Sequence, residues 1–172
     1  MKKAILRYGL YGAASICILV ILSWLIVENL SYSVREIIGY ASIVVSLSFV
    51  FFGIRHFRDK INDGRVSFGK ALLLGLAISF ITALAFGVLD VIYIKYINPD
   101  FTEEYYTRSL AKLEEALPAA EFELERVKME SQKELFMSPV MSFILMSMTV
   151  FVIGFIISLL SAMILQRKKI TT

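Results

Sequence analysis

Residues 71–94 read ALLLGLAISFITALAFGVLDVIYI, and Asp90 is the one charged residue in this stretch. A helix needs about 20 predominantly apolar residues to cross the hydrocarbon core of a bilayer. Three further stretches meet this requirement without a charge, and they cover residues 8–27, 37–54 and 140–165. No strand-like alternation of apolar and polar residues separates them. The pattern therefore predicts an all-α membrane protein with four transmembrane helices.

The composition of the whole chain supports this interpretation. Of the 172 residues, 58% are apolar and 19% are charged, and the mean hydropathy is +0.72. Soluble domains are about 45–50% apolar and about 25% charged, so the composition argues against a water-soluble fold. At this length we expect a single membrane domain, residues 1–172. Lys2 and Lys3 precede the first apolar stretch as they would in a signal peptide, but that stretch exceeds the about 7–15 residues of a signal core. We expect it to be a retained span.

Basic residues are distributed unequally between the two sides of the predicted helices. The amino end, the loop between the second and third spans and the carboxyl tail hold eleven of the eighteen Lys and Arg residues but two of the fifteen acids. Because short cytoplasmic loops retain Lys and Arg, we predict a multi-pass protein of the cell inner membrane with both termini in the cytoplasm. The net charge of +3 then reflects contact with the lipid bilayer, and no nucleic-acid partner is expected.

A mostly polar segment, residues 98–138, separates the third and fourth spans. Asp100 followed by Glu103 has the spacing of a capping box at a helix start. Pro118 interrupts the helical periodicity that follows, because proline inside a helix costs about 3 kcal/mol. A second helix is predicted over residues 119–136. We therefore expect an extracytoplasmic helical hairpin between the third and fourth spans.

Two sequence patterns describe this hairpin in more detail. Its first helix carries an apolar stripe at helical spacing, made of Tyr106, Leu110, Leu113 and Leu117. Its second helix contains three oppositely charged pairs one turn apart, namely Glu123–Arg126, Glu125–Lys128 and Glu130–Lys133. The stripe has three candidate uses: it folds back on its own protein, pairs with another copy or contacts a partner. Folding back is the simplest of the three.

Asp90 is a candidate intramembrane polar residue, because an ionisable side chain inside a span is a functional hypothesis by default. It follows Ala71 by nineteen residues, which places it about 28 Å along a hydrocarbon core of about 30 Å. Near that interface the carboxylate can reach water, Lys95 or Arg35. We favour a structural anchor over a role in transport.

Small residues recur at every fourth position of the third span, and the fourth span repeats the pattern. Small side chains let helices approach closely in lipid. The rows predict tight packing of the third span inside the bundle or against a second copy. The candidate helix-packing residues are Ala71, Gly75, Ser79, Ala83, Gly87, Gly154, Ser158 and Ala162.

No pattern indicates a catalytic, cofactor or metal site. Cys17 and His56 are the only residues of their kind, which argues against a disulfide and a histidine-based metal centre. The loop between the second and third spans has the GxxxxGK spacing of a phosphate loop, but it lacks the following Ser or Thr and a preceding strand. In the same loop, Arg58 and Asp59 are interpreted as a polar turn with salt links. We predict no enzyme activity, no cofactor and no metal.

Several short motifs also occur in a characteristic order along nearly the whole chain. They are Phe57-Arg58-Asp59, Gly64, Ser67-Phe68-Gly69, Gly75, Asn98-Pro99-Asp100-Phe101, Gly154, Ser158-Leu159-Leu160-Ser161-Ala162 and Arg167-Lys168-Lys169. In this order and spacing the chain resembles a bacterial family catalogued as domain of unknown function 4199. The resemblance implies four membrane helices with a long polar insert before the last, and it implies no known activity.

These observations favour a non-enzymatic membrane protein that binds or positions a protein partner, either another membrane protein or a second copy of itself. The alternative is a small transporter or channel assembled from several copies, because one four-helix bundle rarely encloses a pore. That alternative depends on Asp90 and on the hydroxyl groups of the second to fourth spans.

Overall fold

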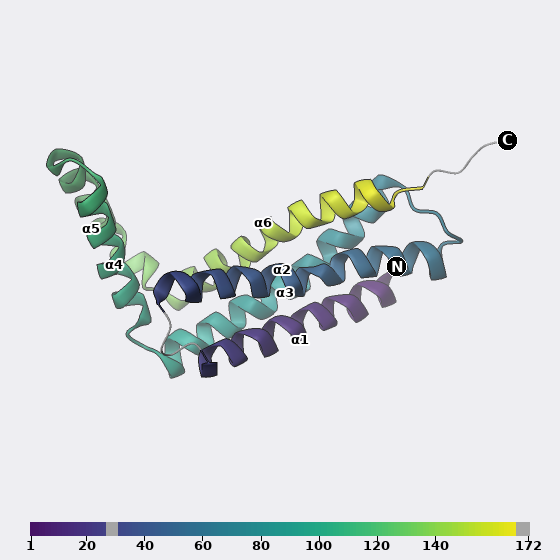
Figure 1. Cartoon of the computed structure of the whole chain (residues 1–172), viewed down its shortest axis with the longest axis horizontal. Coiled ribbons are helices and arrows are strands. Elements are labelled where there is room, and N and C mark those ends of the chain that lie inside the picture. Colours follow the sequence, from purple (N-terminus) through teal and green to yellow (C-terminus); the bar gives the residue numbers. More distant parts are fainter. Residues whose placement is uncertain (27–30, 168–172) are drawn as a thin grey trace. The chain divides into compact units, whose positions relative to one another are not determined.

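The computed structural model describes residues 1–26 and 31–167, and in this part of the chain all regular structure is helical (Figure 1). The elements are α1 (Lys2–Ile26), α2 (Tyr32–His56), α3 (Phe68–Ile92), α4 (Phe101–Ala116), α5 (Ala119–Phe136) and α6 (Pro139–Leu165). Two short π-helical turns, η1 (Phe57–Ile61) and η2 (Tyr93–Ile97), follow α2 and α3. Val27, which ends the first predicted span, and Lys168 and Lys169 of the tail lie outside the described residues.

Four of the helices are long and apolar enough to cross a membrane, so the predicted helical class and the four membrane-type helices are confirmed. Each of these four helices begins before the apolar run that predicted it. Helix α2, for example, begins at Tyr32 and contains Arg35 and Glu36 in its first turns. The helix includes these charged residues because a long charged side chain near a helix end can reach water without interrupting the helical hydrogen bonds.

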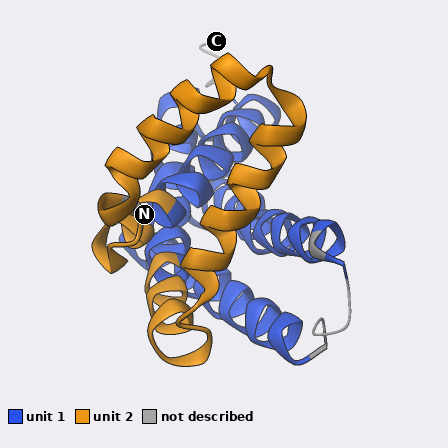
Figure 2. Ribbon diagram, turned by 90° about the vertical axis from the view of Figure 1, so that its left-hand side faces the viewer, with its two compact units in different colours: residues 1–86, 146–172 blue, residues 87–145 orange. Residues whose placement is uncertain are grey.

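The chain forms two compact units (Figure 2). Residues 1–86 and 146–172 make up the first unit, and residues 87–145 make up the second. The sequence predicted one membrane domain with an insert at residues 98–138. The second unit is larger than that insert, because it includes the end of α3 and the beginning of α6.

In the first unit, α1, α2 and the adjoining parts of α3 and α6 share one apolar core. Helices α1 and α2 are antiparallel: Ser15 lies beside Ser46, and Tyr8 lies beside His56. The largest side chains that are fully buried are Ile16, Leu47, Ile54, Leu74, Ile78, Val50, Val66 and Val150.

Helix α6 has an inverted distribution of side chains. Gly154, Ser158 and Ala162 are buried, whereas Ile156 is 52% exposed and Ile164 is 69% exposed. In water, burying apolar surface stabilises a protein by about 25 cal/mol per Å², and an exposed apolar side chain loses this stabilisation. In lipid that penalty disappears, and small residues are the ones that bring helices together. The distribution is the one expected of a helix that packs against its neighbours on one face and meets acyl chains on the other.

In the second unit, α4 and α5 form the predicted helical hairpin. Leu117 is extended and Pro118 occupies the N-cap of α5, so the chain reverses where the proline prevents a continuous helix. At the other end of α4, the rings of Tyr93 and Phe101 meet edge to face with their centroids 5.3 Å apart. This contact connects η2 to the first residue of the hairpin.

Candidate functional site

Asp90 lies near the end of α3, and its carboxylate has a specific partner on α6. Ser142 Oγ donates a hydrogen bond to Asp90 Oδ2 over 2.5 Å. Ser142 belongs to the first turn of α6, where the exposed amides and the helix dipole favour a neighbouring negative charge. The sequence suggested water, Lys95 or Arg35 as partners of Asp90 and did not identify Ser142. The geometry gives Asp90 a role as a link between two membrane-type helices.

The small-residue rows of α3 and α6 meet in the first unit. A Cβ added to Gly75 would lie 2.8 Å from Ser158 Cβ, and one added to Gly154 would lie 2.5 Å from Ser79 Cβ. The hydroxyl oxygens of Ser79 and Ser158 are 3.3 Å apart, and Ser158 also donates to the carbonyl of Gly154 over 2.6 Å. We call Gly75, Ser79, Gly154 and Ser158 the α3–α6 seam. A side chain at Gly75 or Gly154 would therefore lie too close to the serine of the facing helix.

The remaining predicted packing residues are also buried. Ala71, Ala83 and Ala162 are at most 1% exposed and belong to the first unit, where they are part of its core. Gly87 is buried at the beginning of the second unit.

Three close helix contacts involve glycines that the sequence analysis did not single out. A Cβ on Gly9 would lie 2.6 Å from Ile81 Cδ1, and a Cβ on Gly12 would clash with the hydroxyl of Thr82. A Cβ on Gly53 would lie 2.5 Å from Ile78 Cδ1. The signal that could have found the first two is their spacing of three residues within α1.

Arg58 connects the loop after α2 to the end of α6. Its guanidinium is largely buried and binds both carboxylate oxygens of Asp59, at 2.6 and 3.1 Å. The Nη1 group donates to the carbonyl of Leu165 over 3.3 Å, and the amide of Arg167 donates to the carbonyl of Val66 over 2.9 Å. A cation beside the last carbonyl groups of a helix stabilises the helix end, because it binds carbonyl oxygens that lack a partner and interacts favourably with the negative end of the helix dipole. The predicted polar turn is therefore also a C-terminal cap for α6.

The hairpin is joined by polar contacts between its two helices. Tyr106 of α4 donates to a carboxylate oxygen of Glu130 over 2.6 Å, and Lys133 of α5 binds Glu103 at 3.0 Å. These hydrogen bonds raise the pKa of the Tyr106 hydroxyl and the pKa of the Lys133 ammonium above their usual ranges. The ammonium of Lys133 also lies 4.7 Å from the centre of the Tyr106 ring.

Two local predictions for the hairpin are wrong. Asp100 occupies the N-cap of α4 but makes no capping hydrogen bond, because its backbone is helical rather than extended. Lys133 pairs with Glu103 of the other helix instead of with Glu130 one turn away, since α4 brings a carboxylate into reach. The pairs Glu123–Arg126 and Glu125–Lys128 are present as predicted, at 2.9 and 2.6 Å.

One face of α5 exposes an apolar stripe. Leu124 is 60% exposed, Val127 is 59% exposed and Leu135 is 54% exposed. Together with Ser131, they follow one another at intervals of three or four residues and so share one side of the helix. The opposite side of α5 carries Phe122 and Met129, which are half-buried. We call Leu124, Val127 and Leu135 the α5 stripe.

The α5 stripe differs from the many exposed apolar side chains of α1, α2, α3 and α6. Those four helices are candidate membrane spans, where lipid covers apolar surface, whereas α5 is not a candidate span. Apolar side chains gathered on one face of a polar helix indicate a contact surface. Among residues 1–26 and 31–167, no three His, Cys, Asp or Glu side chains lie close enough to hold a metal ion.

Comparison with known proteins gives one family. A family model described as protein of unknown function (DUF4199) matches residues 7–167. No curated protein and no solved structure matches the chain significantly.

Proposed function

The chain belongs to the DUF4199 family of proteins of unknown function, and from this premise we propose that it is a non-enzymatic inner-membrane protein whose α4–α5 hairpin binds a protein partner. The family and the four membrane-type helices are consistent with a multi-pass membrane protein. The observation that supports partner binding most strongly is the α5 stripe, an apolar surface on a helix that is not a candidate span.

The stripe is large enough to contribute to a specific contact. Burying a Val or Leu side chain completely stabilises by about 1.5–3 kcal/mol relative to leaving it in water. The three side chains of the stripe are already about half covered by their own helix, so docking recovers about half of that amount from each. A few residues commonly dominate the energy of a protein interface, so a small apolar surface can contribute to a specific contact.

The charge of the hairpin favours a different protein over a second copy. Residues 101–136 contain nine acidic and five basic residues. Two identical hairpins would bring together two surfaces of the same net sign, which opposes association. A partner helix with an apolar face bordered by Lys and Arg has the complementary chemistry.

The α3–α6 seam also favours a different protein over a second copy of this chain as the partner. The sequence left open whether the small-residue rows pack inside the chain or against a second copy. In the structure Gly75 and Gly154 are in contact with Ser158 and Ser79 of the same chain. These residues therefore contribute to the fold, and the surface for a partner lies elsewhere.

For orientation, we propose that both termini are cytoplasmic and that the hairpin is extracytoplasmic. The support is the unequal distribution of Lys and Arg, since Arg58, Arg65 and Lys70 follow α2 whereas acids predominate in the hairpin. Under this orientation the α5 stripe meets partners outside the cytoplasm.

A small oligomeric transporter or channel is the second candidate, and Asp90 is the observation that favours it, because a carboxylate in a membrane-type helix often marks an ion pathway. Solute or proton flux into proteoliposomes that disappears with Asp90→Asn would support this candidate. Flux absent across a broad panel of ions and small solutes would exclude it.

The partner-binding proposal is tested by affinity purification of the full chain from membranes after mild crosslinking. Val127→Glu places a charge in the α5 stripe, whereas Gln132→Glu places the same charge at an exposed position on another side of α5. We expect a partner band that is retained with Gln132→Glu and lost with Val127→Glu. A band equally strong with both variants, or no specific band with either the wild type or the control, would contradict the proposal.

A further inference from the structure

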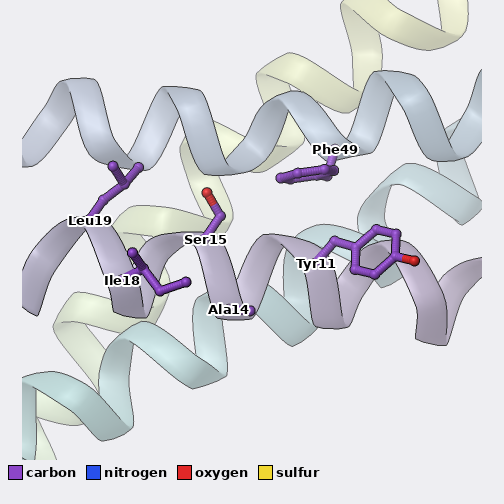
Figure 3. A pocket seen from close by; sticks show the side chains of 6 residues that line it. All are labelled: Tyr11, Ala14, Ser15, Ile18, Leu19 and Phe49. Atoms are coloured by element: carbon purple, nitrogen blue, oxygen red, sulfur yellow. The ribbon is translucent and has the colours of Figure 1, made fainter.

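A shallow groove runs along the outer surface of α1 and α2 in the first unit (Figure 3). It has a volume of about 450 Å³ and is lined by Tyr11, Ala14, Ser15, Ile18 and Leu19 of α1 and by Phe49 of α2. Small side chains lie between bulky ones along the groove: Ala14 and Ser15 come between Tyr11 and Ile18 in α1, and the rings of Tyr11 and Phe49 are 5.9 Å apart.

The groove lies entirely within two candidate membrane spans, so its occupant must be apolar. Ser15 does not alter this, because its hydroxyl faces α2 and lies 3.4 Å from the hydroxyl of Ser46. From Tyr11 to Leu19 the helix rises about 12 Å, close to half of a hydrocarbon core that is about 30 Å thick. A single acyl chain from one leaflet has the matching chemistry and length.

A basic group stands at the end of the groove that Tyr11 borders. Arg7 is exposed and lies one turn before Tyr11 on the same face of α1, and Lys3 lies one turn earlier. Arg7 Nε donates to the Tyr11 hydroxyl over 3.1 Å, which holds the guanidinium beside the ring that borders this end of the groove. Its carbon atom Cζ is 5.8 Å from the centre of the Tyr11 ring.

The rest of the Arg7 guanidinium is available for a ligand. Within the described residues, the hydrogen bond of this side chain is made by Nε, so neither Nη group donates to a protein acceptor. No acidic residue occurs between Met1 and Ile26 to neutralise Arg7 or Lys3. A guanidinium fork matches two oxygens of a phosphate.

We propose that this is a binding site for one anionic phospholipid: an acyl chain occupies the α1–α2 groove, and the headgroup phosphate binds Arg7 with Lys3 beside it. The inference goes beyond the proposed partner function, since it concerns a different surface and different helices. The negative headgroup is specified because Arg7 and Lys3 lie one turn apart on α1, which contains no acidic residue, and each contributes attraction to anionic lipid near a membrane surface.

The test uses the full chain reconstituted into vesicles that carry a phospholipid with a photoreactive group in the middle of one acyl chain. The labelled lipid is phosphatidylglycerol in one preparation and phosphatidylcholine in the other. After irradiation, the labelled peptides are mapped by mass spectrometry. We expect labelling of residues 14–19, with phosphatidylglycerol favoured by about fivefold for each basic group that contributes about 1 kcal/mol.

Three variants separate the parts of the proposal. Arg7→Gln should reduce the preference for phosphatidylglycerol, and Ala14→Phe should fill the groove and remove the labelling of residues 14–19. Val152→Phe adds a ring at an exposed position of α6 that is not part of the groove, and it should leave labelling unchanged. Arg7 and Ala14 are both exposed, so neither change disturbs the core.

The proposal is overturned if wild-type residues 14–19 are labelled equally by both lipids, or if Ala14→Phe is labelled as strongly as the wild type. Labelling spread evenly over the exposed faces of α1, α2 and α6 would also overturn it, because it would indicate an ordinary lipid annulus.

Discussion

Ser79 on α3 and Ser158 on α6 face each other with their hydroxyl oxygens 3.3 Å apart. Both side chains are completely buried, and Ser158 is bonded in addition to the carbonyl of Gly154. An unpaired buried hydroxyl would cost free energy, so this mutual arrangement lets two polar groups lie inside a membrane-type bundle. The pair also explains why Gly75 and Gly154 beside it have no side chains: there is no space for one.

The seam predicts a specific effect of added volume. Gly75→Leu should lower the free energy of unfolding by about 1–3 kcal/mol, because overpacking forces neighbouring helices apart. Gly39→Leu is the matched control, since a Cβ on Gly39 of α2 meets no atom within 4 Å. Denaturation followed by circular dichroism in detergent measures both. Equal stability of the two variants would show that the seam is not as tight as described.

The link between α3 and α6 through Asp90 predicts an energetic coupling. Ser142→Ala removes the donor and should cost about 1.5–3 kcal/mol, as expected for a hydrogen bond to a charged group. Combining it with Asp90→Leu should cost less than the sum of the two single changes, because the carboxylate that needed a partner is gone. A double-mutant cycle on the free energy of unfolding measures the coupling. Strictly additive effects would mean that the two side chains do not interact.

The cap formed by Arg58 predicts local loosening at the end of α6. Arg58→Met removes the donor to Leu165 and leaves Asp59 without its two hydrogen bonds. We expect faster hydrogen exchange of the Gln166 and Arg167 amides, whose bonds to Ala162 and Val66 hold this end. Arg65→Met, in the same loop at an exposed position, is the control and should leave exchange unchanged. Unchanged exchange in Arg58→Met would contradict the cap.

The contacts between α4 and α5 predict a dependence on alkaline pH. The folded hairpin raises the pKa of Tyr106 mainly through its hydrogen bond to Glu130, and it raises the pKa of Lys133 mainly through Glu103. A group whose pKa is higher in the folded state contributes its full stabilisation of the hairpin at pH values below its unfolded pKa, which is about 10 for Tyr and 10.4 for Lys. This stabilisation is lost as the pH rises through the pKa of the folded state.

The distance between α4 and α5, measured with a pair of spin labels at exposed positions, should therefore be constant from neutral pH to about pH 9 and increase above about pH 10. Tyr106→Phe removes one of the two titrating groups and should weaken this dependence. A hairpin that opens equally at alkaline pH with and without the Tyr106 hydroxyl would contradict the assignment.

Much of the fold follows from local signals in the sequence. The four apolar runs predicted the four long helices, since length and lack of charge are properties of each run alone. Pro118 marked the turn between α4 and α5 for a similarly local reason. The family resemblance, based on motifs such as Phe57-Arg58-Asp59 and Asn98-Pro99-Asp100-Phe101, is confirmed by the match over residues 7–167.

The contacts that connect the helices could not be predicted in the same way. Ser142 is 52 residues from Asp90, and Leu165 is 107 residues from Arg58, so these pairs exist only once the helices have packed. The same holds for Lys133, where a carboxylate from α4 competes successfully with the local one. The prediction that Asp100 caps α4 was wrong, because the residue spacing of a capping box is present but the backbone of Asp100 is helical instead of extended.

The most direct test of partner binding uses a photoreactive amino acid at position 127 of the full chain in native membranes, with position 132 as the control. The account predicts one discrete product at position 127, formed with a protein other than this chain, and no such product at position 132. Products that are equally abundant at both positions, or that consist of two copies of this chain, would contradict it.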